Sequence, residues 1–113
     1  MRAVTNDGVV LAMQVIEHDV EGTLTFWTEA VTRRVRDAQG YALLGTEEIR
    51  AASGEDGTLL RFGRDVRGVA YRYSVAVYVT EDHIFIAEAG GREEAFVPLE
   101  GDVDDALTGV ELR

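Results

Sequence analysis

The sequence predicts an α+β fold, an antiparallel sheet of about five strands with one long helix packed on it and a short C-terminal helix. Residues 69–80 alternate apolar side chains with mixed ones, which is the period of a strand, whereas residues 23–38 repeat apolar side chains at helical spacing. Short turns join the later strands, which favours antiparallel pairing. The length of 113 residues suits a single domain, residues 1–113.

The first half of the chain predicts one strand followed by the long helix. Residues 9–16 come after the turn signal Asp7-Gly8 and are apolar along most of their length, so we expect a buried strand. Along residues 23–38 the apolar side chains share one side of a helix: Leu24, Trp27, Val31, Val35 and Ala38. Gly40 supplies a C-terminal stop.

The middle of the chain predicts a meander of strands. An extended segment starts at residues 41–44 and continues through residues 48–51, before a turn cluster of serine and glycines. Further strands are expected at residues 58–64, 69–80 and 84–89.

The C-terminal part predicts the end of the sheet and two helical segments. Gly90-Gly91 is expected to end the last strand, and residues 92–97 to form a helical turn before Pro98. A final helix is expected over residues 102–108, because Asp102 is a favourable N-cap and acids in the first turn meet the helix dipole.

The strand at residues 69–80 carries the main functional hypothesis. Its odd-numbered residues form a continuous stripe of valine and tyrosine for the core. Its even face presents Arg72, Ser74 and Tyr78, a mixture of arginine, tyrosine and a small polar residue that is typical of protein-binding surfaces. Together with Arg61 of the preceding strand, these are the candidate partner-binding residues.

A second interpretation of the same face leaves no binding surface. In it the C-terminal helix covers the strand and buries Ala76 and Tyr78 against Leu107 and Val110. The sequence leaves the open and the covered face as equal alternatives.

Composition narrows the classes of function. The net charge is −10, from 21 acidic and 11 basic residues, so the molecule repels phosphate backbones and we expect no nucleic-acid partner. There is no cysteine, which excludes disulfides and thiolate nucleophiles. All basic residues are arginine, which excludes lysine Schiff-base chemistry. No apolar run is long enough to span a bilayer and the N-terminus lacks a secretory pattern, so a cytoplasmic location is expected.

Two histidine turns carry the alternative function. His18 and His83 each lie beside two carboxylates, the combination used by metal sites and general-base pairs. If the two turns met in space, they would form a small-ligand or metal site, or an active site. Successive side chains within each turn point apart, however, which favours solvated turns and no metal or cofactor.

One basic cluster lies on the expected helix, at Arg33, Arg34 and Arg36. Arginine forks match phosphate geometry, so a phosphate site is one interpretation. The stronger one is structural, because these residues lie near acids such as Glu29 and Asp37 and at the helix end that favours positive charge.

Several short motifs carry a resemblance that spans roughly residues 9–112. They are the helix start Gly22-Thr23-Leu24-Thr25-Phe26-Trp27, the segment Gly40-Tyr41-Ala42-Leu43-Leu44, Ser53-Gly54-x-x-Gly57-x-Leu59-Leu60-x-Phe62, Gly68-x-Ala70-Tyr71-x-Tyr73 and Ile84-x-Ile86-x-Glu88-Ala89-Gly90. Their order resembles the PsbP/DcrB-like fold.

The resemblance implies an α/β/α sandwich without catalysis. Members include photosystem-associated PsbP proteins, a Ran-binding nuclear import factor, bacterial lipoproteins and the Eag chaperones of type VI secretion effectors, which act by binding proteins. We therefore expect a bacterial, non-catalytic protein-binding module, such as a chaperone or adaptor for a secretion effector. A homodimer that pairs sheet edges or faces is a third hypothesis. No family site residue carries over onto this chain.

Overall fold

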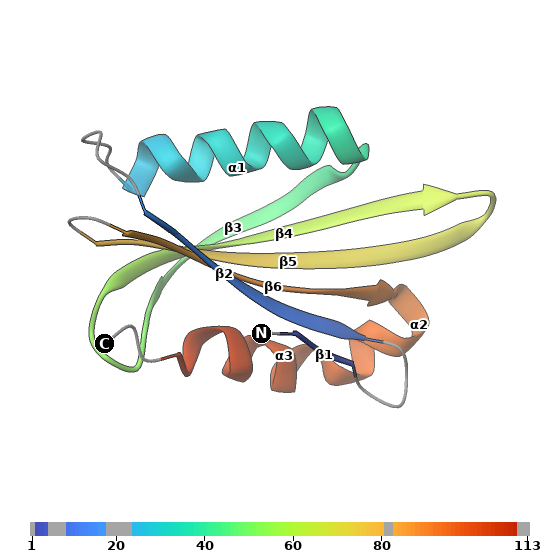
Figure 1. The fold of residues 1–113 in the computed structure, drawn as a ribbon. Helices are drawn as coiled ribbons and strands as arrows, with labels where there is room; N and C mark the ends of the chain where they lie inside the picture. Colours follow the sequence, from blue (N-terminus) through green and yellow to red (C-terminus); the bar gives the residue numbers. More distant parts are fainter. Residues whose placement is uncertain (1, 5–8, 18–23, 81–82, 111–113) are drawn as a thin grey trace.

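The computed structural model describes residues 2–4, 9–17, 24–80 and 83–110. An antiparallel sheet lies between one long helix, α1, and the C-terminal helices α2 and α3 (Figure 1). The order of its strands is β1-β2-β6-β5-β4-β3, which puts β3 at one edge. The elements are β1 Arg2–Val4, β2 Val10–Glu17, α1 Leu24–Gln39, β3 Ala42–Arg50, β4 Asp56–Val66, β5 Val69–Val79, β6 His83–Arg92, α2 Glu93–Phe96, a 3₁₀ turn Val97–Leu99 and α3 Glu100–Thr108.

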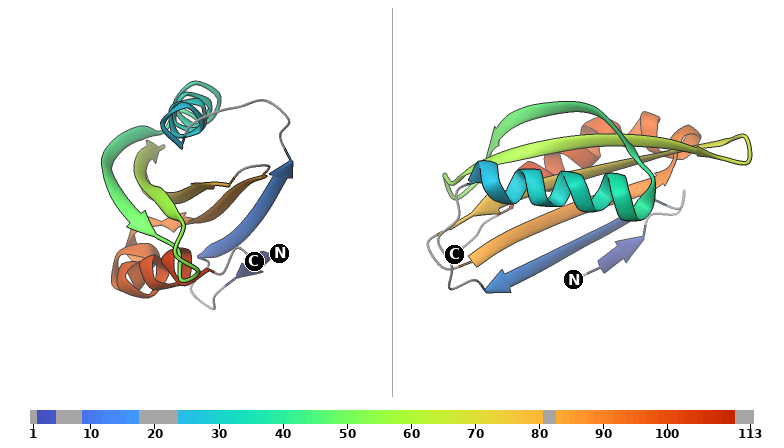
Figure 2. Two further views of the ribbon diagram at one scale, coloured as in Figure 1. Left: turned by 90° about the vertical axis from the view of Figure 1, so that its left-hand side faces the viewer. Right: turned by 90° about the horizontal axis from the view of Figure 1, so that it is seen from above.

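This architecture confirms the predicted fold class, with five long strands and the short β1 added at the edge beside β2. The end-on view in Figure 2 shows α1 and α3 on opposite sides of a strongly curved sheet. The observed α1 differs from the predicted helix by a single residue at each end. The predicted strand at residues 69–80 is β5, which pairs with β4 on one side and β6 on the other.

The face of the sheet beneath α1 holds one of two cores. Helix α1 packs on β3, β4 and β5. The odd-numbered residues of β5 point to this side, because successive side chains of a strand alternate between faces. The buried residues here are Val31, Val35, Leu60, Phe62, Val75, Val77, Ile84 and Ile86.

The opposite face holds the second core, beneath the C-terminal helices. It contains the even-numbered Ala76 and Tyr78 of β5 and is closed by Phe96, Val103 and Leu107. The remaining buried members are Val9, Ala51, Leu59, Ala87 and Ala89. Both faces of the central strands are therefore covered, which makes the molecule a three-layer sandwich.

One boundary prediction is wrong, because Gly90-Gly91 does not end the sheet. Strand β6 continues to Arg92, and Gly90 pairs with Tyr73 of β5. A Cβ atom on Gly90 would lie 3.1 Å from Cδ1 of the Tyr73 ring. The glycine therefore gives space to a cross-strand aromatic ring and continues the strand, instead of breaking it.

The hairpin between β4 and β5 is tighter than predicted. Only Arg67 and Gly68 separate the two strands, and both have positive φ angles, of 52° and 83°. This is the conformation of the two-residue turns whose twist suits antiparallel strands. None of the described helices is long and apolar enough to cross a membrane.

Candidate functional site

The face predicted to bind a partner is covered by α3. Tyr78 has no exposed surface, and its hydroxyl donates a 2.8 Å hydrogen bond to the carbonyl oxygen of Leu107. Ser74 is only 2% exposed. Of the two alternatives, the structure has the covered face, because the amphipathic C-terminal segment folds back on the strand.

Arg61 and Arg72, the two arginines among the candidate partner-binding residues, contact the C-terminal segment that covers this face of the sheet. Arg61 donates to both carboxylate oxygens of Asp104, over 3.0 and 2.9 Å, and also contacts Glu47 and Glu100 at 3.1 and 3.5 Å. The hydrogen bonds with Asp104 raise the pKa of Arg61. Arg72 pairs with Glu93 at 3.4 Å. Both arginines bind the acidic C-terminal segment, which occupies the place that a partner was expected to take.

On the other face, aromatic rings gather near the end of α1. The ring centres of Tyr41 and Tyr73 are 5.4 Å apart, and those of Phe62 and Tyr73 are 6.1 Å apart. The guanidinium of Arg64 lies 4.6 Å from the centre of the Tyr41 ring and 5.8 Å from that of Tyr71. Arg64 also donates a 2.7 Å hydrogen bond to the carbonyl of Gln39. These contacts fix the helix end to the sheet by packing and cation–π attraction.

The hydroxyl of Tyr73 donates a 2.7 Å hydrogen bond to Glu88. Burial, followed by this hydrogen bond to a carboxylate, raises the pKa of Tyr73 well above its usual range. Beside it, a hollow of about 170 Å³ separates α1 from β6, with Trp27 and Arg34 on the helix and Ile84 and Ile86 on the strand.

The buried tyrosines predict a loss of stability at alkaline pH. Burial raises the pKa of Tyr78 from 10.0 to about 12, so the folded chain keeps this proton above pH 10 while the unfolded chain releases it. As far as these tyrosines are concerned, the free energy of unfolding therefore does not change with pH below about pH 10. Above that pH it falls by about 1.4 kcal/mol per pH unit for each such tyrosine, up to the pKa of that tyrosine in the folded chain. Urea unfolding between about pH 9 and pH 11.5 measures this slope.

Tyr78→Phe is the control for the alkaline transition. It removes one of the released protons, so its slope is expected to be shallower than that of the wild type. The chain has no lysine to titrate in the same range. Equal slopes for the two proteins would contradict the assignment to Tyr78.

The two histidine turns do meet at one end of the sheet, because Glu17 of β2 pairs with His83 of β6. His83 begins β6, where its backbone N–H donates a 3.2 Å hydrogen bond to Oγ1 of Thr80. His18 lies outside the described residues, as do Glu81 and Asp82. Within the described part of the chain, no group of three or more histidine, aspartate or glutamate side chains has the arrangement of a metal site.

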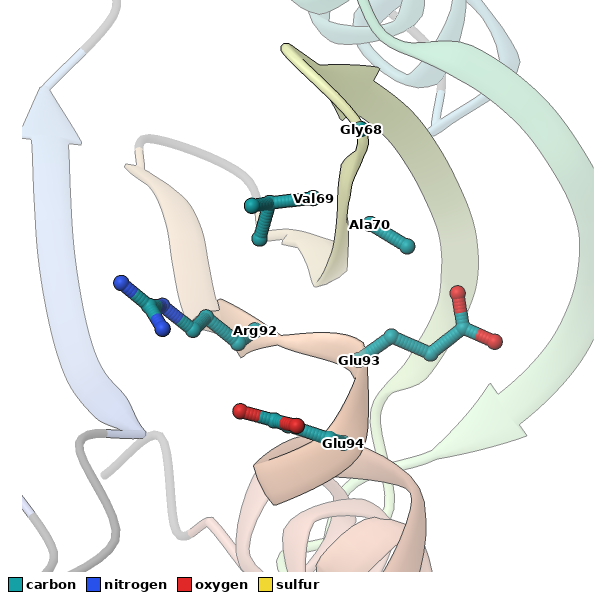
Figure 3. Close-up of a pocket in the computed structure, with 6 residues that line it drawn as sticks. All are labelled: Gly68, Val69, Ala70, Arg92, Glu93 and Glu94. Carbon is teal, nitrogen blue, oxygen red and sulfur yellow. The ribbon is translucent and has the colours of Figure 1, made fainter.

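A hollow of about 500 Å³ lies where the β4–β5 hairpin meets the start of α2 (Figure 3). Its charged side chains diverge: Arg92 and Glu94 extend to one side and Glu93 to the other. Glu93 is also held by Arg72. A ligand in this hollow would not meet converging groups, so we assign it no function.

Another groove, of about 510 Å³, runs between α1 and the edge strand β3, and we call it the α1/β3 groove. The sheet contributes Leu43, Thr46 and Leu60 to it. The helix contributes Thr28, Glu29, Thr32, Arg33, Arg36 and Asp37. It combines two leucines and a threonine on the sheet with a largely charged wall on the helix.

Strand β3 leaves its outer edge without a neighbouring strand in the described sheet. Its second half carries Glu47, Glu48 and Arg50, and charges of this kind protect sheet edges against unwanted pairing. The first half, residues 42–46, has no charged residue and exposes Leu43 and Leu44 at 38% and 55%. The accessible part of the edge therefore lies beside the α1/β3 groove.

The arginine cluster agrees in part with its structural interpretation. Arg36 lies in the last turn of α1, and Arg33 lines the groove together with Glu29 and Asp37. Arg33, Arg34 and Arg36 form no ion pair within the described residues. Arg33 and Arg36 face the α1/β3 groove. The sequence reasoning missed the groove, although the arginines and the Leu43-Leu44 pair were both visible.

No family model and no curated protein matches this sequence. Solved structures share its fold. The crystal structure of PA94 from Pseudomonas aeruginosa, a protein of unknown function, matches with a TM-score of 0.69 and 12% identity, covering 93% of this chain and 73% of that one. The solution structure of the cyanobacterial PsbP, CyanoP, from Synechocystis sp. PCC 6803 matches with a TM-score of 0.67 and 17% identity. That match covers 86% of this chain and 63% of that one, so this chain spans less than two thirds of CyanoP. At these identities the likeness shows a PsbP-like fold and nothing more.

Proposed function

We propose that this domain is a non-catalytic protein-binding module that holds an extended segment of a partner along β3, in the α1/β3 groove. One observation carries the proposal, the uncharged half of an open edge strand beside a groove of about 510 Å³. A narrower form of the proposal is a chaperone or adaptor for a secreted effector, because the PsbP/DcrB-like fold that the sequence resembles includes such chaperones.

The chemistry of an open sheet edge supports this mode of binding. An extended peptide adds to such an edge through main-chain hydrogen bonds, and grooves for its alternate side chains supply the specificity. In this chain, Leu43 is 38% exposed and offers an apolar surface to such side chains, and α1 forms the opposite wall. The partner segment would lie between a strand and a helix, with water excluded from both sides.

The test uses a random-peptide display library selected on the purified domain. Peptides that bind are expected to shift the backbone amide signals of β3 and of α1 in a two-dimensional NMR spectrum. Leu43→Asp is expected to weaken their binding at least about tenfold, because it places a charge on this apolar surface.

Val66→Asp is the matched control, since Val66 is 40% exposed and Leu43 is 38% exposed. Val66 ends β4 at the hairpin, away from the α1/β3 groove. It is expected to leave peptide binding unchanged. Equal binding by wild type and Leu43→Asp, or signal shifts confined to α3, would overturn the proposal.

A further inference from the structure

The two walls of the α1/β3 groove differ in chemistry. The helix presents Arg33 and Arg36 one turn apart, and the sheet presents Leu43, which is 38% exposed. A peptide strand paired with β3 turns every second side chain toward the face that α1 covers. Those alternate side chains are the ones that meet the arginines and Leu43.

Two arginines and two acids line the groove, and the arginines lie between the acids along the helix. Arg33 and Arg36 make no ion pair with a described residue, although the whole molecule has a net charge of −10. A guanidinium binds a carboxylate through two parallel hydrogen bonds, so an acidic side chain is its matched partner. Glu29 and Asp37 flank the two arginines along the helix and line the same groove, so they repel an acid at either end. The attraction is thereby confined to the centre.

A buried hydroxyl lies in the same wall. Oγ1 of Thr28 is buried and has no hydrogen-bond partner within the described residues. Leaving such a group unsatisfied costs about 1–3 kcal/mol. Because the atom is closed off by its neighbours, it adds no polar position to the surface of the groove.

We infer that the partner's segment carries aspartate or glutamate opposite Arg33 and Arg36, and an apolar residue two positions away against Leu43. Two positions are the repeat of side chains on one face of a strand. This inference rests on the proposed function, because it names the chemistry of the segment that β3 binds.

The experiment selects peptides from one random display library on four proteins in parallel. They are the wild type, Arg33→Glu, Arg36→Glu and the control Arg92→Glu. Arg92 is exposed at the end of β6 and lies outside the groove, so its reversal changes the net charge equally. Thermal melts of all four proteins verify that each remains folded.

Peptides selected on the wild type and on Arg92→Glu are expected to carry an acid two positions from an apolar residue. On Arg33→Glu and Arg36→Glu the acid should be replaced by lysine or arginine, and wild-type peptides should bind at least about tenfold more weakly. If the peptides selected on all four proteins had the same amino-acid composition, the inference would be overturned and the proposed function would still stand. A wild-type pool no more enriched than a pool selected on Leu43→Asp would overturn both.

Discussion

Tyr78→Ala is expected to lower the free energy of unfolding by about 3–5 kcal/mol, the usual cost of removing a buried aromatic side chain. Tyr78 is the largest fully buried side chain, and it lies between β5 and α3. Its removal opens a cavity beneath α3 and deletes the hydrogen bond to Leu107. The total stability of a domain of this size is about 5–15 kcal/mol, so the variant should be close to unfolding.

Urea unfolding followed by circular dichroism measures the effect of Tyr78→Ala. Tyr78→Phe keeps the ring and loses only the hydroxyl, so it should cost about 0.5–1.5 kcal/mol and separate packing from hydrogen bonding. A loss below about 1 kcal/mol for Tyr78→Ala would mean that α3 does not cover the strand in solution.

Gly57→Ala is expected to produce the second large loss of stability. It too acts at Tyr78, but it adds a methyl group where there is no space, whereas Tyr78→Ala leaves a cavity. Gly57 pairs with Tyr78 across β4 and β5, and a Cβ atom there would lie 2.5 Å from Cδ1 and Cε1 of the Tyr78 ring. It would also lie 2.9 Å from the carbonyl oxygen of Val77. Since ring and backbone would both have to shift, the added methyl group should cost about 1–3 kcal/mol.

Gly101→Ala is the matched control for Gly57→Ala. Gly101 lies in α3, and a Cβ atom there would meet nothing within 4 Å. Alanine in a helix is favoured over glycine by up to about 1 kcal/mol, so this variant should be neutral or more stable. If Gly57→Ala unfolded at the same urea concentration as the wild type, the close approach of Tyr78 would be disproved.

The elements with strong periodicity were predictable. Apolar spacing located α1, and alternation located β5 almost to the residue. Gly90 was misread because glycine usually interrupts strands, and only the register with Tyr73 shows that it makes space for a ring. Local patterns of the sequence do not contain that cross-strand pairing.

The candidate site was harder to predict than the fold. Which strand lies at the edge of a sheet depends on the order of all the strands, and the sequence of β3 looks like that of any half-buried strand. Arg33 and Arg36 were expected to be satisfied within the helix, a rule that holds for many exposed charges. Their position beside β3 appears only once α1 is packed on the sheet.

The strand order has a consequence for how the chain folds. Strands β3 to β6 are neighbours both in sequence and in the sheet, so their contacts close only short loops. The register of β2 with β6, by contrast, joins Val10 to Gly90 and Glu17 to His83. Strand β2 can therefore form these pairs only after β6, the last strand of the chain, is available. Pairings of such long sequence separation slow folding. During synthesis, the apolar strand β2 therefore has only the three-residue strand β1 as a sheet neighbour until β6 has been made.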